Sequence, residues 1–571
     1  MKNPLRKCGD SLNVTQFVAN FLAENGVTHV FGYQGGAVIK LIDSIVATGS
    51  IRYTQNYHEQ ACAFCADAYS RINGNFGVAI ATSGPGATNL ITGIANAHLD
   101  SIPTLFITGQ EYSSRIKKKN GVRSNGFQDL DIVEVVKTIT KYAVVVTDAQ
   151  RIAYELEKAL YLAKSERPGA VLIDIPIDIQ FQEIDEISLE HFIPNTQETN
   201  SINQDDVKKF IALLKAAKRP MILGGGGIML AGAQDTFKKF VKETHIPVAL
   251  TLNGLDIHEN YVGFSGLYGN INACIAVYNA DLLIVIGARL GQHQVGKAKS
   301  TYTNAKIVHI DIDELELGRT MPEELSIRSD LKVFLDAVNS NLATDSLPDY
   351  HEWLSSIHNW TLKYAKQFAS TGIGVSPTRL IHETQKYFDS DAVITADVGQ
   401  NQMWVAQTLR LHGHQRLLNS SGLGSMGYAL PAAIAAKLCR PKSTVIAFMG
   451  DGGFQMNIQE LQLVKLKKLN IKLFIFNNGA LGLIKSTQDK YFKNHELGCT
   501  YPDFDCVNLK AIAAAYDLNY FKICADSDIN LLHAIFDSNQ ATLVEVLVDS
   551  EYPLKTRADM TSIFLEEIIN V

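Results

Sequence analysis

The chain alternates short apolar runs with amphipathic segments along almost its whole length. Between the apolar runs, polar and apolar residues recur with the period of a helix, as in 151–164 and 204–218. Many of the runs are continuously apolar rather than alternating, which is typical of parallel strands buried on both faces. The predicted strands are 78–81, 104–108, 170–175, 220–223, 282–286, 306–310, 392–394, 445–449, 473–476 and 542–548. The pattern predicts an α/β fold built from doubly wound parallel sheets.

Two polar stretches interrupt this alternation and are interpreted as linkers. The first, 181–206, contains "PNTQETNSINQDD", and the second, about 339–377, contains "NSNLATDSLPDYHEW" and "STGIGVSP". Because strand–helix alternation resumes after each stretch, we expect three α/β domains. Their predicted bounds are 1–183, 205–338 and 375–571.

Composition narrows the class of protein. The 571 residues are 46% hydrophobic and 19% charged, with a formal net charge of −7, so nothing favours a nucleic acid or an acidic membrane as partner. The first residues, "MKNPLRKCGDSLNV", lack the apolar core of a signal peptide, and no run is long enough for a transmembrane helix. We therefore expect a cytoplasmic protein whose eight cysteines are reduced thiols. Cys62 and Cys65 form a CxxC within "EQACAFCADAYSR", where packing on a helix face is favoured over a metal or redox site.

The stretch 450–485, "GDGGFQMNIQELQLVKLKKLNIKLFIFNNGALGLIK", places polar side chains at two strand ends. Asp451 follows one apolar run and Asn478 follows the next, 27 residues later, with one predicted amphipathic helix between them. A right-handed crossover makes the two strands parallel neighbours, so both side chains meet at one sheet edge. A carboxylate, an amide oxygen and the backbone carbonyl just after form an oxygen-only set that suits Mg²⁺ bound to phosphate. The alternative, two turns that merely end strands, stays open on spacing alone.

The same stretch resembles the thiamine diphosphate (ThDP) motif of ThDP enzymes, GDG followed about 25–30 residues later by NN. The resemblance then extends through nearly the whole chain, to the catalytic subunit of the acetolactate synthases. It is carried by "HEQACAFCADAYSRINGNFGVAIATSGPGATNLITGIANAHLDSIPTLFITGQ", "FQDLDIVEVVKTITKYAVVV", "SERPGAVLIDIPIDIQ", "AKIVHIDID", "VGQNQMW" and "GLGSMGYALPAAIAA". These long stretches occur in the order that the family has.

The resemblance implies roles for individual residues. It implies that Asp451 and Asn478 bind Mg²⁺ through their side chains and Ala480 through its carbonyl, and that Met426 is the apolar wedge under the V-shaped cofactor. Glu59, in "YHEQ", matches the glutamate that bonds N1′ of the pyrimidine, although a carboxylate at a helix start is also a common structural feature. Gln128, in "FQD", matches a glutamine that faces the reacting carbon. Further positions that match cofactor-binding residues are Gly35, Pro85, Asn89, Gln400, Asn401, Gly424, Gly450, Gly452, Gly453, Leu481 and Gly482.

Departures from the family concentrate where an acceptor substrate is expected. Gln34 replaces the proline of YPGG, so that a side-chain amide is expected near the reacting carbon. Asn401 replaces the histidine of VGQHQMW, His293 stands where a second arginine is usual, and Thr487 stands where the synthases have a tryptophan. The donor machinery therefore looks intact while the acceptor pocket has changed.

The connection 111–126, "EYSSRIKKKNGVRSNG", is longer than in the synthases and is strongly basic. Its basic residues are Arg115, Lys117, Lys118, Lys119 and Arg123. One interpretation is a solvated loop. The other is a lid that meets an anionic acceptor, such as a nucleotide-linked keto sugar.

The central segment resembles the domain through which the synthases bind FAD without using its redox chemistry. Positions that match flavin-binding residues are Arg167, Gly225, Gly226, Thr251, Arg289, Asp311 and Asp330. The run "GGGG" does not complete a G-x-G-x-x-G fingerprint, and Tyr268 replaces a usual histidine. FAD is therefore expected, with ADP or an empty domain as alternatives.

Together these features predict an enzyme, a ThDP- and Mg²⁺-dependent carboligase of acetolactate-synthase type. It would decarboxylate a 2-oxo acid such as pyruvate and transfer the two-carbon hydroxyethyl unit to a second carbonyl, in a 2-oxo acid or a keto sugar. A simple decarboxylase or pyruvate oxidase, and a non-catalytic ThDP-fold protein, remain alternatives. Because family active sites combine two subunits, a homodimer or homotetramer is expected, and the sequence leaves a regulatory subunit open.

Overall fold

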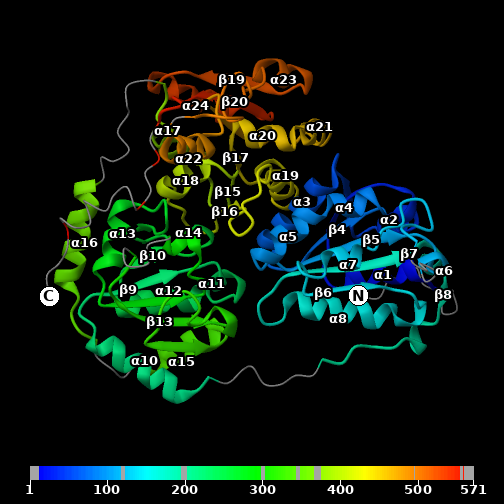
Figure 1. Cartoon of the computed structure of the whole chain (residues 1–571), viewed down its shortest axis with the longest axis horizontal. Coiled ribbons are helices and arrows are strands. Elements are labelled where there is room, and N and C mark those ends of the chain that lie inside the picture. The colour runs from blue at the N-terminus through cyan, green and yellow to red at the C-terminus, as the bar shows by residue number, and fades with distance from the viewer. Residues whose placement is uncertain are drawn as a thin grey trace. The chain divides into compact units, whose positions relative to one another are not determined.

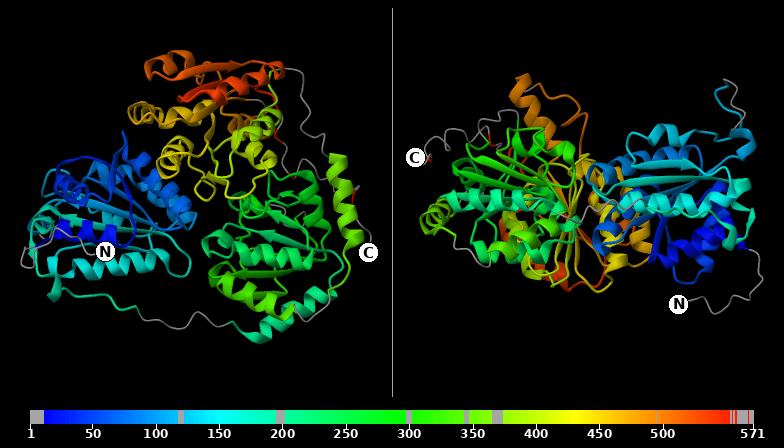
Figure 2. Two further views of the ribbon diagram at one scale, coloured as in Figure 1. Left: turned by 180° about the vertical axis from the view of Figure 1, so that it is seen from behind. Right: turned by 90° about the horizontal axis from the view of Figure 1, so that it is seen from below.

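The computed structural model contains three six-stranded sheets, and every neighbouring pair of strands within each of them is parallel (Figures 1 and 2). It describes residues 12–116, 122–194, 202–296, 302–342, 347–364, 374–493 and 495–552, together with Leu554, Arg557 and Glu567. The α/β fold with doubly wound parallel sheets is confirmed. Each sheet falls within one of the three segments expected from the sequence.

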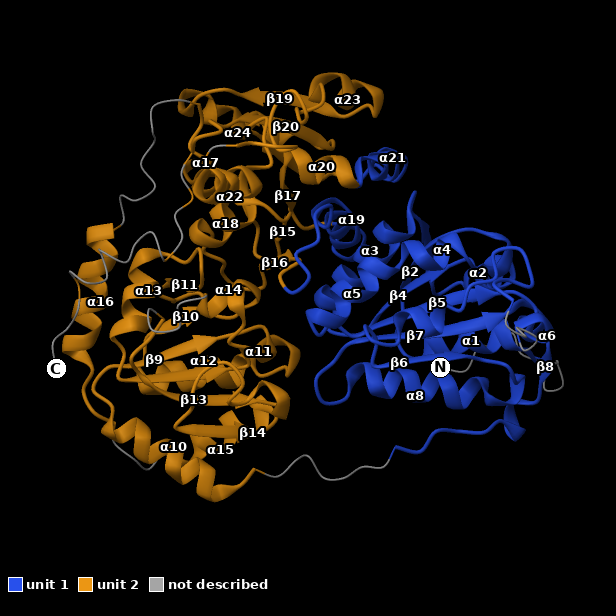
Figure 3. Cartoon of the chain, in the orientation of Figure 1, with its two compact units in different colours: residues 1–195, 422–441, 457–469 blue, residues 196–421, 442–456, 470–571 orange. Residues whose placement is uncertain are grey.

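By its internal contacts the chain divides into two compact units, coloured separately in Figure 3. Unit 1 comprises residues 1–195, 422–441 and 457–469, and unit 2 comprises 196–421, 442–456 and 470–571. Unit 1 therefore takes two short segments from the C-terminal third of the chain. Among the residues that the structure describes, no helix is long and apolar enough to cross a membrane.

The sheet of unit 1 has the strand order β3-β2-β4-β5-β7-β6, and its predicted runs are buried along their whole length. The strands are β2 (His29–Tyr33), β3 (Arg52–Gln55), β4 (Gly77–Ala81), β5 (Thr104–Gln110), β6 (Tyr142–Val145) and β7 (Ala170–Pro176). The helices are α1 (Val14–Glu24), α2 (Ile39–Ala47), α3 (Glu59–Asn73), α4 (Pro85–Asn89), α5 (Ile91–Leu99), α6 (Ser113–Ile116), α7 (Ile132–Val136), α8 (Ile152–Lys164), α9 (Ile177–Gln180), α19 (Ala429–Cys439) and α21 (Leu461–Leu466). β1 (Leu12–Asn13) and β8 (Glu183–Ile184) form a separate two-stranded antiparallel sheet.

The first sheet of unit 2 has the order β11-β10-β9-β12-β13-β14. Its strands are β9 (Pro220–Gly224), β10 (Val248–Leu250), β11 (Gly263–Phe264), β12 (Leu282–Ile286), β13 (Lys306–Asp311) and β14 (Leu325–Arg328). Its helices are α10 (Gln204–Ala216), α11 (Gly227–Leu230), α12 (Gln234–Thr244), α13 (Ile271–Asn279), α14 (Gln292–Val295) and α15 (Leu331–Leu342). Chain order reverses between β9 and β12, which is the strand order of dinucleotide-binding folds.

The second sheet of unit 2 has the order β16-β15-β17-β18-β20-β19. Its strands are β15 (Val393–Ala396), β16 (Arg416–Asn419), β17 (Val445–Gly450), β18 (Lys472–Asn477), β19 (Asn519–Ile523) and β20 (Thr542–Leu547). Its helices are α17 (Pro377–Thr384), α18 (Gln400–Thr408), α20 (Asp451–Met456), α22 (Gly482–Phe492), α23 (Leu509–Ala515) and α24 (Leu532–Asp537). Numbered within each sheet, this order is the same as that of unit 1, so the first and last sheets share one topology.

Two features differ from the sequence prediction. The stretch 339–377 is more than a connector, because it contains α16 (His351–Tyr364), whose Trp353, Ile357 and Trp360 are buried. The single helix expected between β17 and β18 is divided into α20, a 3₁₀ turn at Ile458–Glu460 and α21. Residues 457–469 of this crossover belong to unit 1.

Candidate active site

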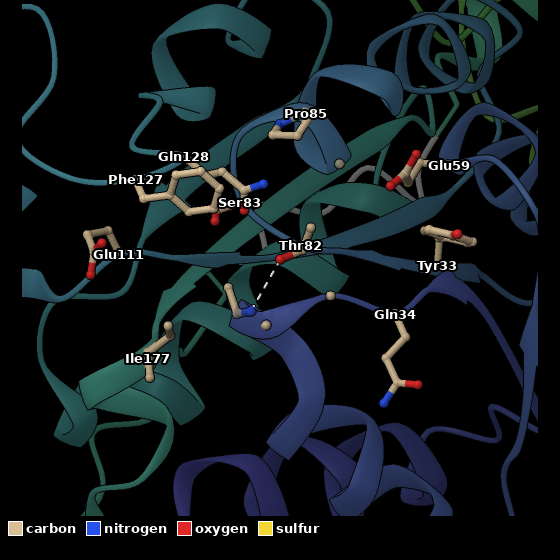
Figure 4. A pocket seen from close by; sticks show the side chains of 14 residues that line it. Tyr33, Gln34, Glu59, Thr82, Ser83, Pro85, Glu111, Phe127, Gln128 and Ile177 are labelled. Carbon is tan, nitrogen blue, oxygen red and sulfur yellow. Dashed lines mark hydrogen bonds between the residues drawn. The ribbon is translucent and has the colours of Figure 1, made fainter.

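A cavity of about 510 Å³ opens at the carboxyl ends of the central strands of unit 1 (Figure 4). The loops that follow β2, β4 and β5 supply most of its wall, in the region where open parallel sheets bind ligands. Fourteen residues line it: Tyr33, Gln34, Gly35, Gly36, Ala37, Glu59, Thr82, Ser83, Pro85, Gly86, Glu111, Phe127, Gln128 and Ile177. The cavity thus brings together five of the residues predicted near the cofactor and the reacting carbon, namely Gln34, Gly35, Glu59, Pro85 and Gln128.

Glu59 is the first residue of α3 and is only 6% exposed. The helix begins there because His58 is extended and its ring accepts a hydrogen bond from the backbone N–H of Gln60. Asn89, at the end of α4, donates to Glu59 Oε2 at 2.9 Å and thereby turns the carboxylate toward the cavity. Gly86 leaves room for it, because a Cβ there would lie 3.1 Å from Glu59 Oε1. Asn89 itself is not a lining residue and acts on the site through Glu59.

Gln128 adopts a left-handed backbone conformation with φ +59°. It lies directly against Gly84, where an added Cβ would be 2.7 Å from Gln128 Cβ. A non-glycine residue at positive φ is strained, and such positions occur where surrounding structure fixes a side chain for function. Gln34 is exposed at the cavity mouth, and Figure 4 shows its side chain extending from the loop after β2.

The basic connection 111–126 is anchored at its start. Ser113 donates from its backbone N–H and its hydroxyl to the carboxylate of Asp178, at 2.8 and 2.6 Å. Asn125 Nδ2 donates to the backbone oxygen of Arg115. The guanidinium of Arg115 forms an ion pair with the Glu111 carboxylate at 3.2 Å. Glu111 and Phe127 line the cavity, and the sequence analysis did not single them out. Lys117, Lys118 and Lys119 lie outside the described residues.

The GDG and NN segments meet in unit 2, because β17 and β18 are paired in parallel register. Asp451 is 2% exposed; its Oδ1 accepts from the backbone N–H of Gly452 at 2.8 Å and its Oδ2 from that of Gly479 at 2.9 Å. Burial raises the pKa of Asp451 to about 6, and these backbone bonds lower it in part. A nearby cation would remove this cost of the charged form.

Asn478 and Gln400 lie together at the same strand ends. Asn478 Nδ2 is 3.3 Å from Gln400 Oε1, and Asn478 Oδ1 accepts from the backbone N–H of Ala480 at 3.3 Å. Gly482 at the start of α22 is needed for this approach, because a Cβ there would lie 2.0 Å from Gln400 Oε1. Leu481 caps the helix and its N–H donates to the backbone oxygen of Cys499.

Other residues predicted around the diphosphate fall into two groups. Asn401 is buried and its amide donates to the backbone oxygens of Asp397 and Phe448, so it joins the ends of β15 and β17. β17 ends at Gly450, and Gly452 and Gly453 lie in α20. A Cβ at Gly453 would lie 2.6 Å from Asp397 Oδ1. Gly424 and Met426 lie in 422–441 and are therefore assigned to unit 1.

The donor set at β17 and β18 fits a hard divalent cation with a diphosphate. Asp451 and Asn478 offer a carboxylate and an amide oxygen, and the backbone carbonyl of Ala480 follows directly. Oxygen-only sets with few protein ligands are those that Mg²⁺ prefers when phosphate completes its coordination. The absence of side chains at Gly453 and Gly482 lets Asp397 and Gln400 lie close to the backbone at these strand ends.

Only some of the residues predicted to bind FAD lie together at the strand ends of the central sheet. β9 is followed by Gly225 and Gly226, and β10 is followed by Thr251. Gly225 lies close to the end of β12, because a Cβ there would be 2.3 Å from the backbone oxygen of Gly287. Arg289 also follows β12. Asp311 ends β13 and accepts from the N–H of Asp313.

Two further flavin positions already have structural roles. The Asp330 carboxylate accepts from the N–H groups of Lys332 and Val333 at the start of α15, so it serves as a helix cap. Arg167 belongs to unit 1, where its Nε donates to Ser101 Oγ at 2.9 Å.

Models of three thiamine pyrophosphate enzyme domains match the chain: the N-terminal TPP binding domain over residues 12–135, the central domain over 207–338 and the C-terminal TPP binding domain over 397–546. The acetolactate synthase large subunit of Lactococcus lactis is 35% identical over 548 residues, which cover 95% of this chain and 93% of that one. Isozyme 2 of Escherichia coli, also a large subunit, is 33% identical over 568 residues, covering 98% and 100%. The chain belongs to the acetolactate synthase-like family of ThDP enzymes.

Because it belongs to this family, the chain is a ThDP-dependent enzyme. The N-terminal model covers the residues that line the Glu59 cavity except Ile177, and the C-terminal model covers Asp451 and Asn478. The sequence analysis found these residues from motifs. It missed the buried pair of Asn56 and Glu460, because 404 residues separate these two polar positions and neither belongs to a motif used above.

Proposed function

We propose that the chain is a ThDP- and Mg²⁺-dependent carboligase that takes a two-carbon unit from pyruvate, or a similar 2-oxo acid, and adds it to a second carbonyl. The observation that carries this proposal is the buried carboxylate of Glu59, held by Asn89 at the wall of the unit 1 cavity. When bound, ThDP supplies a nucleophilic carbon that attacks the 2-oxo carbon and accepts the electrons released with CO₂. The remaining tasks fall to residues of the chain.

In this proposal Glu59 exchanges a proton with N1′ of the cofactor pyrimidine. The carboxylate is shielded from water at 6% exposure, and a proton shared in such a site is transferred over a short fixed distance. Gly35 and Pro85 line the cavity and are proposed to flank the pyrimidine ring. Gln128, fixed at positive φ, and Gln34 offer amides to the substrate.

The diphosphate end is proposed to lie at β17 and β18. Asp451, Asn478 and the carbonyl of Ala480 would hold Mg²⁺, with Gln400, Asn401, Leu481 and Gly482 around the phosphates. Gly424, Met426, Gly450, Gly452 and Gly453 are proposed to complete the cofactor site, as the family resemblance implies.

For the acceptor, the cavity wall favours a hydroxyl-bearing carbonyl compound such as a nucleotide-linked keto sugar over a second 2-oxo acid. None of the fourteen described residues that line it is lysine or arginine, and Glu111 adds a second carboxylate on the side of the cavity away from Glu59. A carboxylate accepts hydrogen bonds from hydroxyl groups and an amide both accepts and donates them. The negative charge of Glu111, partly offset by Arg115 at 3.2 Å, disfavours a second carboxylate. The basic residues of 111–126 are proposed to meet the anionic part of such an acceptor.

FAD is proposed as a structural cofactor of the central sheet. The support is the strand order with its reversal between β9 and β12, since dinucleotides bind at such points. Gly225, Gly226, Thr251, Arg289 and Asp311 lie at these strand ends. Release of the bound nucleotide by heat, followed by chromatography, distinguishes FAD from ADP and from an empty domain.

The deciding experiment incubates the purified protein with ThDP, Mg²⁺ and pyruvate, first alone and then with candidate keto sugars, and identifies products by mass. A ligation product that contains the two-carbon unit supports the carboligase. Acetaldehyde alone indicates a decarboxylase, and anaerobic bleaching of bound flavin by pyruvate indicates an oxidase. No CO₂ release in any mixture refutes catalysis of this type.

The family resemblance also supports assignments that concern the whole chain. We propose residues 1–183 as the pyrimidine-binding domain, 205–338 as the central domain and 375–571 as the diphosphate-binding domain. A cytoplasmic homodimer or homotetramer completes the proposal, and light scattering of the purified protein measures that state with and without cofactor. Copurification from cells tests for a regulatory subunit.

A further inference from the structure

Unit 1 contains a buried carboxylate, Glu460, that none of the roles above uses. It is fully buried on the 3₁₀ turn Ile458–Glu460. Its Oε1 accepts from the backbone N–H of Tyr57 at 2.8 Å, and its Oε2 accepts from Asn56 Nδ2 at 3.0 Å. Asn56 is also fully buried. Removing the acceptor therefore deprives the Tyr57 N–H of this partner and leaves the buried Asn56 amide only its bond to Cys65 Sγ at 3.4 Å, which is costly because sulfur is a weak acceptor.

The groups that donate to Glu460 directly precede Glu59 in the chain. Residues 56–58 connect β3 to α3, and Glu59 is the first residue of that helix. On the other side, Asn457 Nδ2 donates to Gln60 Oε1 at 3.1 Å and to the backbone oxygen of Gly427 at 2.8 Å. The segment 457–460 therefore holds the chain both before and after Glu59.

The surroundings of Glu460 make it a hydrogen-bond acceptor rather than a member of an ion pair. Both of its donors are neutral groups. The thiols of Cys62 and Cys65, on the next turn of α3, are fully buried, and burial is the main cause that raises their pKa values. Cys65 donates to the backbone oxygen of Pro431 on α19 at 3.1 Å. Burial raises the pKa of Glu460 itself to about 7.

We propose that Glu460 is a positioning residue for Glu59: it fixes the connection 56–58, and so the start of α3, at the place where the Glu59 carboxylate meets the cofactor pyrimidine. The proposal rests on the proposed function of Glu59. Its consequence is that loss of Glu460 affects turnover more than substrate affinity, because the proton-transfer distance at Glu59 changes while the cavity wall remains.

The chain offers an informative pair of variants. In Glu460→Ala both donors lose their acceptor. In Glu460→Gln the amide oxygen still accepts from Tyr57. Asn56 Oδ1 is buried and has no hydrogen-bond partner among the described residues. If the Asn56 side chain rotates by about 180°, this oxygen accepts from the introduced amide N–H. Glu155→Ala is a matched control, since Glu155 is another buried acid of unit 1, on α8, bonded to Tyr142 and Arg151.

The experiment measures CO₂ release from pyruvate at saturating ThDP and Mg²⁺, the melting temperature, and amide hydrogen exchange of the peptide that covers 56–62. We expect E460A to lower kcat at least tenfold with KM for pyruvate changed less than threefold, and to speed exchange in that peptide. E460Q is expected to recover kcat to within threefold of wild type, and E155A to lower only the melting temperature.

A kcat of E460A within threefold of wild type, with a lowered melting temperature, overturns the proposal and leaves Glu460 a purely structural acid. An E460Q variant as slow as E460A also overturns it. If the wild-type protein releases no CO₂, the proposed function fails separately, and the exchange comparison then decides. Faster exchange in 56–62 for E460A alone supports the positioning role, and unchanged exchange overturns it.

Discussion

The amide of Gln110 donates to the carboxylate of Asp174 at 2.8 Å, in the buried interior of unit 1. The same amide also donates to the backbone oxygen of Leu130, and Gln110 Oε1 accepts from the N–H of Glu111. One buried pair therefore holds both ends of the loop that carries Glu111, Phe127 and Gln128 to the cavity. The cavity wall therefore depends on a buried polar cluster that is not itself among its lining residues.

This cluster predicts a pH-dependent stability. Burial raises the pKa of Asp174 to about 7 from an ordinary value of 3.8, although bonds from Thr108 and Gln110 favour the charged form. Because the folded state holds the proton more tightly than the unfolded state, the contribution of this carboxyl group to stability is fully present below about pH 4 and is lost as pH rises through about 7. Asp174→Asn removes this titration, so its melting temperature relative to wild type should rise between pH 5 and pH 8, by the equivalent of about 3 kcal/mol.

Differential scanning calorimetry at both pH values checks this. Asp205→Asn, at an exposed position of α10, serves as the control and is expected to shift both curves equally. A constant difference between D174N and wild type across this range contradicts the prediction.

The second prediction concerns Glu59. Glu59→Gln preserves shape and the bond from Asn89 but cannot exchange a proton, so CO₂ release from pyruvate should fall by about 10²–10⁴-fold. Binding of ThDP, followed by calorimetry, should weaken much less because the other walls of the cavity remain. Turnover like that of wild type would refute the role of Glu59.

The sequence predicted best the strands that lie inside the sheets. Runs such as 104–108 and 282–286 became β5 and β12, because a strand covered on both faces must be apolar throughout. Strands with polar or half-buried residues, such as β6 and β3, carry no such signal and were missed. Helix α16 was hidden by polar composition, although Trp353, Ile357 and Trp360 show helical spacing.

At the site, motifs indicated residues whose chemistry is local, such as Asp451 and Glu59. They did not indicate the residues that hold these in place. Glu460 and Asp174 accept hydrogen bonds from partners that only folding brings near, and an isolated acid in a sequence is most often a solvated one. The supporting network therefore emerged only from the structure.

The third prediction concerns the metal. Asp451→Ala removes a carboxylate from the proposed Mg²⁺ site. Loss of a residue that only supports a metal ligand typically lowers metal affinity by about 10–100-fold, so loss of the ligand itself should lower the apparent affinity for ThDP by more than that. The amount of ThDP retained after gel filtration measures this. Wild-type protein treated with EDTA should lose ThDP in the same way and regain it with Mg²⁺. Asp503→Ala, at an exposed position outside the strand ends, should retain cofactor. Equal retention by D451A would contradict the assignment.

The last prediction concerns the acceptor. Figure 4 shows Glu111 and Ile177 toward one side of the cavity and Glu59 and Tyr33 toward the other. An acceptor that reaches Glu111 would therefore lie away from Glu59, the carboxylate proposed to serve the cofactor. Glu111→Gln should lower the ratio of ligation product to CO₂ by about tenfold with a hydroxyl-bearing acceptor, since a hydrogen bond to a charged group contributes roughly 1.5–3 kcal/mol. With a second 2-oxo acid as acceptor, removal of this negative charge should raise the same ratio. Mass spectrometry of the products measures both, and Glu134→Gln, exposed on α7, is the control. Equal ratios for E111Q and wild type with both acceptors would exclude Glu111 from acceptor recognition.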